Sequence, residues 1–65
     1  MIILSKHAKD QARERGINLN EIKLTIQNGA KYTQEQNKIV SEWGHIRIVY
    51  KKIKEDHFII TVMLR

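Results

Sequence analysis

The spacing of apolar residues changes once along the chain. Ala8 and Ala12 lie four positions apart, and Leu19, Ile22 and Ile26 follow at helical spacing. From residue 30 onwards apolar and polar residues alternate, in runs rich in Val, Ile and aromatic residues. Periods of about 3.6 and about 2 residues are typical of helices and strands with one buried face. The pattern therefore predicts helices followed by strands, an α+β protein.

Residues at the ends of the helical region indicate two short helices. Ser5 is suited to the N-cap of the first helix, and Gly16 to the left-handed position after its end. Asn18 and Glu21 form the capping-box pattern of a second helix, which closes at Asn28-Gly29. The two helices are therefore expected to meet at a tight turn.

Strand-forming runs follow, separated by polar turn signals. The runs cover residues 30–34, 38–43, 45–53 and 57–64. The turns fall at Glu35-Gln36-Asn37, Gly44 and Lys54-Glu55-Asp56. We expect a single domain, residues 1–65, in which two short N-terminal helices pack on a four-stranded antiparallel β-meander.

The strand register follows from keeping apolar residues on one face. The residues expected to meet the helices are Ile46, Ile48, Tyr50, Phe58, Ile60, Val62 and Leu64. A three-residue turn at 54–56 satisfies this condition and pairs Ile53 with His57. A two-residue turn at Gly44-His45 pairs Glu42 with Arg47.

The opposite sheet face is mixed. It is expected to hold Glu42, Arg47, Lys51 and Thr61 together with Val40, Val49, Ile59 and Met63. Such a face could bind a ligand or contact a second copy of the chain. Two simpler interpretations remain open, because Arg47 could be only the cross-strand partner of Glu42, and Thr61 only a good strand former.

Composition narrows the classes of function. The formal net charge of +5 favours an acidic partner, above all a polyphosphate such as RNA. The chain has no cysteine, and its 3 histidines are far apart in the sequence, so we expect no disulfide, metal site or cofactor. The apolar run at residues 1–4 is too short for a membrane span. A cytoplasmic protein with no membrane partner is expected.

One polar stripe on the first helix is the best candidate for chemistry. His7, Gln11 and Arg15 follow one another at four-residue steps. An imidazole can carry a proton near neutral pH, and a guanidinium can clamp a phosphate, so His7 and Arg15 are the residues of interest. A second proton carrier is missing from the stripe, unless His45, His57 or Tyr50 reaches it.

The same residues carry a family resemblance. His7-Ala8, then Arg15-Gly16-Ile17, a helix ending in Asn28-Gly29, and Ile59-Ile60-Thr61-Val62 in the last strand resemble the bacterial and phage family called domain of unknown function 4258. The similarity spans nearly the whole chain. That family has an arginine at the position of Gln11, and its replacement argues for reduced or absent activity.

The resemblance implies a compact α+β fold similar to small ribonuclease toxins of the RelE and barnase-like group, which cleave RNA without a metal. In this interpretation His7 and Arg15 are catalytic, and the residues that contact nucleic acid are Gln11, Arg47, Lys51 and Thr61. The stripe borders the helix-covered face, whereas Arg47 and Thr61 point to the other face. Three arrangements remain open. The active surface could lie at a sheet edge, only the helix stripe or only the sheet residues could be functional, or a second subunit could bring the two sets together.

Two functions from different classes follow. The first is a small basic toxin-like domain that acts on RNA or the ribosome, in its most specific form a metal-independent endoribonuclease. The second is a catalytically inactive binding module, such as a phage or plasmid accessory protein. This module would dock on an acidic protein or nucleic-acid partner, an antitoxin among them, or form a homodimer through the sheet face.

Overall fold

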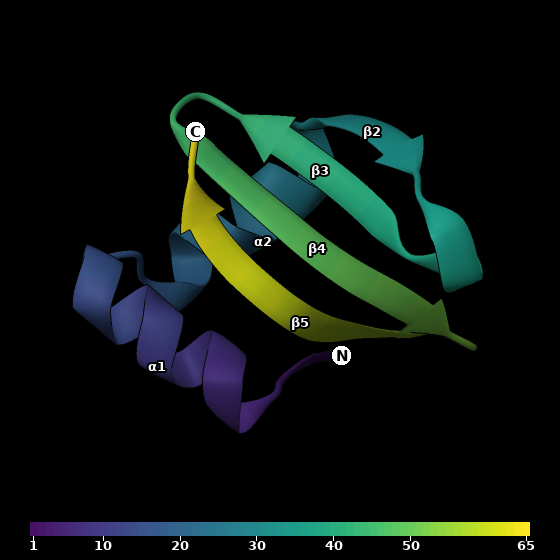
Figure 1. Cartoon of the computed structure of the whole chain (residues 1–65), viewed down its shortest axis with the longest axis horizontal. Helices are drawn as coiled ribbons and strands as arrows, with labels where there is room; N and C mark the ends of the chain where they lie inside the picture. Colours follow the sequence, from purple (N-terminus) through teal and green to yellow (C-terminus); the bar gives the residue numbers. More distant parts are fainter.

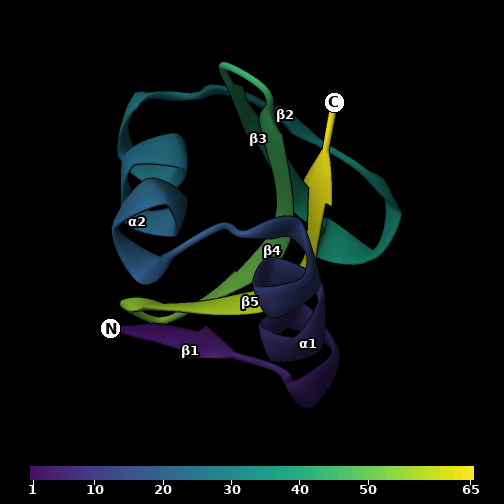
Figure 2. The same cartoon turned by 90° about the vertical axis from the view of Figure 1, so that its left-hand side faces the viewer.

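The computed structural model describes residues 1–65. Its elements, in chain order, are β1 (Ile2–Leu4), α1 (Lys6–Arg15), α2 (Leu19–Asn28), β2 (Ala30–Thr33), the 3₁₀ turn η1 (Glu35–Asn37), β3 (Ile39–Trp43), β4 (Ile46–Ile53) and β5 (Asp56–Leu64). The strands form one sheet in the order β1-β5-β4-β3-β2. Figure 1 shows the part of this order from β5 to β2, and Figure 2 shows β1. Neither helix has the length and apolar character needed to cross a membrane.

The first residues form a strand that the sequence analysis did not predict. β1 pairs in parallel with β5, with Ile2 opposite His57 and Leu4 opposite Ile59 (Figure 2). The α+β class is confirmed, and β2 to β5 form the expected antiparallel meander. The expectation of a purely antiparallel four-stranded sheet is wrong, because β1 adds a fifth, parallel strand. A strand of 3 residues is too short to show alternation. Its partner lies at the far end of the chain, where no local signal points to it.

Both helices have the expected ends. The Ser5 side chain accepts a hydrogen bond from the backbone N–H of Ala8 at 3.0 Å, and Gly16 has a φ of 65°. Asn18 and Glu21 form the complete capping box, with hydrogen bonds of 2.8 and 3.1 Å. These side chains satisfy backbone groups that a helix end leaves free, so the capping signals were sufficient to locate both helices.

The two helices cover the same face of the sheet. The core consists of Ala8, Ala12, Ile17, Ile22, Ile26, Ile46, Ile48, Tyr50, Ile59 and Val62. α1 lies against β5, and α2 lies against β3 and β4. The expected burial of Leu19 is wrong, since it is 54% exposed in the first turn of α2. α2 packs instead through Ile22, Thr25 and Ile26.

The turn between β4 and β5 is shorter than expected. Ile53 pairs with Asp56 rather than with His57, so the turn consists of two residues, Lys54 and Glu55. Lys54 has a φ of 57°, a conformation that usually favours glycine or asparagine. Because neither residue type occupies this turn, a two-residue connection had no local signal.

A β-bulge restores the predicted pairing further along β5. Tyr50 pairs with Ile59, whereas the next residue back along β4, Val49, pairs with Thr61 as predicted. Ile60 is therefore the extra residue, and the register shifts at this point. The turn is one residue shorter than predicted, and the bulge adds one residue to β5, so the two differences cancel. The predicted register is therefore wrong only in the part of β5 before the bulge.

The bulge reverses which side chains of early β5 face the helices. Ile59 is fully buried in the core, whereas Phe58 and Ile60, which were predicted there, are not part of it. Val62, beyond the bulge, is in the core as predicted. The same reversal turns His57 to the helix side, where it lines a pocket with residues of α2.

Candidate functional site

α1 occupies the part of the β5 edge that β1 leaves open. The backbone N–H of Ser5 donates to the carbonyl of Ile59 at 3.1 Å, and its hydroxyl donates to the carbonyl of Ile60 at 3.4 Å. The side-chain oxygen of Gln11 accepts a hydrogen bond from the backbone N–H of Val62 at 3.0 Å. An open edge otherwise presents such groups to another strand. α1 is therefore fixed along β5 by polar contacts as well as by its buried alanines.

The stripe of His7, Gln11 and Arg15 lies on this edge helix. His7 is exposed and makes no side-chain hydrogen bond or salt bridge. A guanidinium nitrogen of Arg15 lies 3.5 Å from the Gln11 carbonyl oxygen and 3.7 Å from the Glu14 carboxylate. The Gln11 oxygen is already bonded, so only its amide NH₂ remains for a ligand. None of the three residues lines a pocket.

A second set of cations lies on the outer side of α1. Lys6, Lys9 and Arg13 are spaced as i, i+3 and i+7, which places them on one side of the helix. All three are exposed, and none of them forms a salt bridge. Among the 12 Lys and Arg side chains, only Arg15, Arg47 and Arg65 form salt bridges. We call this set the α1 basic face. The i, i+3, i+7 spacing of these cations is the signal in the sequence that could have identified this face.

On the sheet face opposite the helices, Arg47 is engaged inside the chain. Its Nε donates to a carboxylate oxygen of Glu42 at 2.6 Å. The same carboxylate accepts from the Tyr32 hydroxyl at 3.4 Å and lies 3.6 Å from the Arg65 guanidinium. The predicted pairing of Glu42 with Arg47 is confirmed. A ligand that binds Arg47 must therefore compete with, or share, this carboxylate.

Lys51 and Thr61 lie on the same face. Both are half-buried, and neither makes a side-chain hydrogen bond or a salt bridge. Val40 and Val49, which share this face, are only 0% and 9% exposed, so the chain itself already covers them. The face therefore offers less open apolar surface than its alternating pattern suggested.

The structure brings the two predicted sets near one another without joining them. Gln11 contacts Val62, the residue that follows Thr61 on β5. Arg47 and Lys51 lie on β4, one strand further from α1. No pocket contains members of both sets. The stripe of His7, Gln11 and Arg15 lies at the edge of the sheet, beside β5. This position corresponds to the first of the three predicted arrangements, an active surface at a sheet edge.

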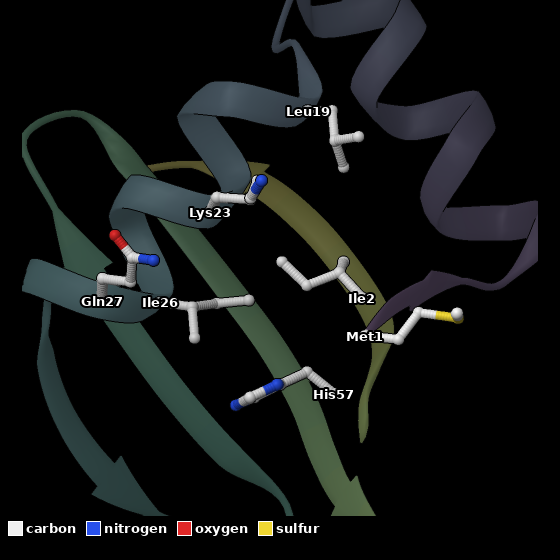
Figure 3. Close-up of a pocket in the computed structure, with 7 residues that line it drawn as sticks. All are labelled: Met1, Ile2, Leu19, Lys23, Ile26, Gln27 and His57. Atoms are coloured by element: carbon white, nitrogen blue, oxygen red, sulfur yellow. The ribbon is translucent and has the colours of Figure 1, made fainter. Parts of the chain in front are cut away.

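A pocket of about 340 Å³ lies between α2, β1 and the start of β5. Its lining residues are Met1, Ile2, Leu19, Lys23, Ile26, Gln27 and His57 (Figure 3). We call it the α2–β1 pocket. Sequence reasoning missed it because it depends on two unpredicted features, the pairing of β1 with β5 and the reversal that turns His57 inward. The apolar run at residues 1–4 was the one available signal.

The polar side chains of this pocket have no partners in the protein. Lys23, Gln27 and His57 are absent from every side-chain hydrogen bond and salt bridge of the structure. No carboxylate lines the pocket. Lys23 and Gln27 are exposed at this pocket, and a pocket that combines apolar side chains with a few polar groups is the usual form of a small-ligand site.

His57 has an altered environment. Burial lowers its pKa, the positive charges of Lys52 and the amino terminus lower it further, and the Asp56 carboxylate opposes them. The ring centroids of His57 and Tyr50 lie 5.4 Å apart with the planes tilted by 51°, and burial raises the pKa of Tyr50. His57 and Tyr50, two of the three residues considered as a second proton carrier, therefore lie beside each other. Neither forms a hydrogen bond with the stripe of His7, Gln11 and Arg15. No group of three or more His, Cys, Asp or Glu residues is placed to hold a metal ion.

Comparison with known proteins gives one clear relationship. A family model described as Domain of unknown function (DUF4258) matches residues 4–64. The match includes α1, α2 and the strands from β2 to β5. Neither the curated proteins nor the solved structures contain a match to this chain.

Proposed function

The chain belongs to the family described as Domain of unknown function (DUF4258). From its surface chemistry we propose that it is a small toxin-like domain that acts on RNA in the cytoplasm. The observation that carries the proposal is the α1 basic face. Three exposed cations that form no salt bridge lie together there, beside Asp10, on a helix held to the sheet edge by Ser5 and Gln11. The net charge of +5 acts in the same direction.

The chemistry of phosphate binding supports this surface. Each Lys or Arg that contacts a phosphate releases counterions, so RNA affinity falls as salt rises. A rigid helix presents its cations without a further ordering cost on binding. The resemblance of motif and element order to RelE and barnase-like ribonucleases raises the expectation of RNA chemistry.

The more specific proposal is a metal-independent endoribonuclease. The ribose 2′ oxygen attacks phosphorus, so a bond from this oxygen to phosphorus forms and the bond from phosphorus to the 5′ oxygen breaks. His7 takes the proton of the 2′ hydroxyl, water gives a proton to the leaving oxygen, and Arg15 binds the charged phosphate. His7 is exposed and unpaired, as this role requires.

A second candidate is the catalytically inactive binding module. The observation that favours it is that no pocket includes His7 or Arg15 and that the Gln11 oxygen is used inside the fold. Such a module would bind an acidic protein, for example an antitoxin, or RNA without cleaving it. Dimerisation through the sheet face gains less support, because Val40 and Val49 are already buried.

Binding to a short labelled single-stranded RNA, measured by fluorescence anisotropy over a salt series, tests the proposal. The triple variant Lys6→Gln, Lys9→Gln, Arg13→Gln should reduce the slope of log affinity against log salt by about 2, at about 0.7 per lost phosphate contact. A matched control replaces Lys31, Lys38 and Lys54 with Gln, which removes the same charge elsewhere. Equal slopes for both variants, or no binding at low salt, would contradict the proposal.

A cleavage assay in EDTA separates the two candidates. The enzyme proposal expects RNA cleavage that His7→Ala and Arg15→Ala abolish, with circular dichroism spectra unchanged. Binding without cleavage of any RNA, with or without ribosomes, would leave the binding module.

A further inference from the structure

The α2–β1 pocket has a ligand chemistry that neither the family match nor the α1 surface explains. We propose that this pocket binds a single nucleotide of an RNA strand, with the base against its apolar floor and the phosphate beside Lys23. The choice of an RNA nucleotide rests on the proposed function. The pocket itself is defined by residues outside α1, so the two proposals can be tested separately.

The floor of the pocket suits a nucleobase. The side chains of Ile26 on α2 and Ile2 on β1 line the space between the helix and the strands (Figure 3). Leu19 and Met1 also line the pocket, and 54% and 82% of their surfaces are exposed. The faces of a base are apolar, and bases in single strands are unstacked and free to enter a pocket. A volume of about 340 Å³ lies within the range of small-ligand sites.

The charge of the pocket selects an anion. Lys23 is exposed and unpaired, and no Asp or Glu lines the pocket. A lysine ammonium binds phosphate as a compact point charge with three donors. A neutral or cationic ligand would leave this charge without a partner.

Gln27 and His57 distinguish a nucleotide from a simple apolar acid. An amide offers both donors and an acceptor, and a neutral imidazole offers one of each. The edge of a base presents matching donors and acceptors, and RNA-binding proteins read single strands through them. An alkyl carboxylate would bury these groups without partners, which is unfavourable.

The imidazole of His57 gives a direct report of an occupied pocket. Burial is the main cause that lowers the pKa of His57, Lys52 on β4 and the amino terminus before β1 lower it further, and Asp56 on its own strand opposes them. Lys23 on α2 lines the same pocket. A bound phosphate adds negative charge, so it should raise the pKa of His57.

The test is a titration of the ¹⁵N-labelled protein with adenosine 5′-monophosphate, followed by NMR. Saturable shifts are expected at Ile2, Lys23, Ile26 and His57, together with a rise in the His57 pKa. Adenosine should shift the same residues without raising this pKa. If inorganic phosphate alone reproduces the whole response, the base is not recognised and the proposal is overturned.

Two single variants separate the pocket from the α1 surface. Lys23→Gln should weaken binding of adenosine monophosphate about tenfold, the usual effect of losing a charge-assisted hydrogen bond. Lys9→Gln removes the same charge from the α1 basic face. It should leave binding of the mononucleotide unchanged while weakening binding of the RNA strand.

The outcomes distinguish failure of each proposal. Salt-dependent RNA binding without any response of the pocket to adenosine monophosphate would overturn the pocket and leave the proposed function. A response of the pocket without RNA binding would support a nucleotide site and contradict the proposed function. Equal effects of the Lys9 and Lys23 variants on the mononucleotide would overturn the placement of its phosphate.

Discussion

α1 and the α2–β1 pocket carry similar polar side chains but use them in opposite ways. On α1, the oxygens of Ser5 and Gln11 bond to the backbone of the helix end and of β5. In the pocket, Lys23, Gln27 and His57 bond to nothing in the protein. A side chain that satisfies the backbone stabilises the fold, whereas an unpaired one beside an apolar floor is available to a ligand. The two glutamines therefore offer a matched pair for separating stability from binding.

The largest expected effect is on stability, at the helix edge. Gln11→Leu removes the acceptor for the Val62 N–H, which should lower the free energy of unfolding by about 1–3 kcal/mol. Gln27→Leu changes the same residue type at an unbonded position and should stay within about 0.5 kcal/mol. Urea unfolding of both variants measures the difference. Equal losses would mean that the bond to Val62 adds nothing.

Ser5→Ala tests the start of the same helix. It removes the cap on the Ala8 N–H and the bond to the Ile60 carbonyl, and should lower stability by about 0.5–2 kcal/mol. Ser5→Thr keeps the hydroxyl and is the control, expected to retain most of the stability in thermal unfolding. A Ser5→Ala protein as stable as the wild type would show that α1 is held by its alanines alone.

Gln11→Arg restores the residue of the family pattern and should act on both properties. Arginine cannot accept a hydrogen bond, so the Val62 N–H loses its partner and stability should fall by about 1 kcal/mol. The new cation should raise RNA affinity and steepen the salt slope by about 0.7. Anisotropy over a salt series measures the second effect, and an unchanged slope would count against placing this stripe on RNA.

The smallest effect is a pH dependence from the pocket. The pKa of His57 in the folded chain is lowered from 6.5, so the unfolded chain binds this proton more readily. Stability should therefore fall as the pH drops from above 6.5 towards the lowered pKa, and should be retained at higher pH. His57→Gln should flatten this part of the profile in urea unfolding. A His57→Gln profile identical to that of the wild type would mean that the His57 side chain is solvated in the folded chain and does not contribute to the pH dependence of stability.

The sequence was informative where the signal is local. Caps at Ser5 and Asn18, the glycine after α1 and the turn at Gly44 located both helices and the β3–β4 hairpin, including the pairing of Glu42 with Arg47. Each of these depends on residues only a few positions apart, where backbone geometry restricts the side chains.

Features that depend on distant contacts could not be predicted. β1 exists because Ile2–Leu4 meets β5 across the whole chain, and the bulge at Ile60 follows from a turn that no glycine marks. The α2–β1 pocket depends on both the pairing of β1 with β5 and the bulge at Ile60, so it could not be predicted from the sequence. The bond between Gln11 and Val62 was equally hidden, because alternation along β5 says nothing about what covers its edge.

The most direct test of the account is an NMR map of the labelled protein with a short single-stranded RNA at low salt. Shifts are expected on the α1 basic face and at Lys23, Ile26 and His57, and all of them should weaken as salt is raised. Shifts confined to β2 and η1, or a spectrum unchanged by RNA, would contradict it.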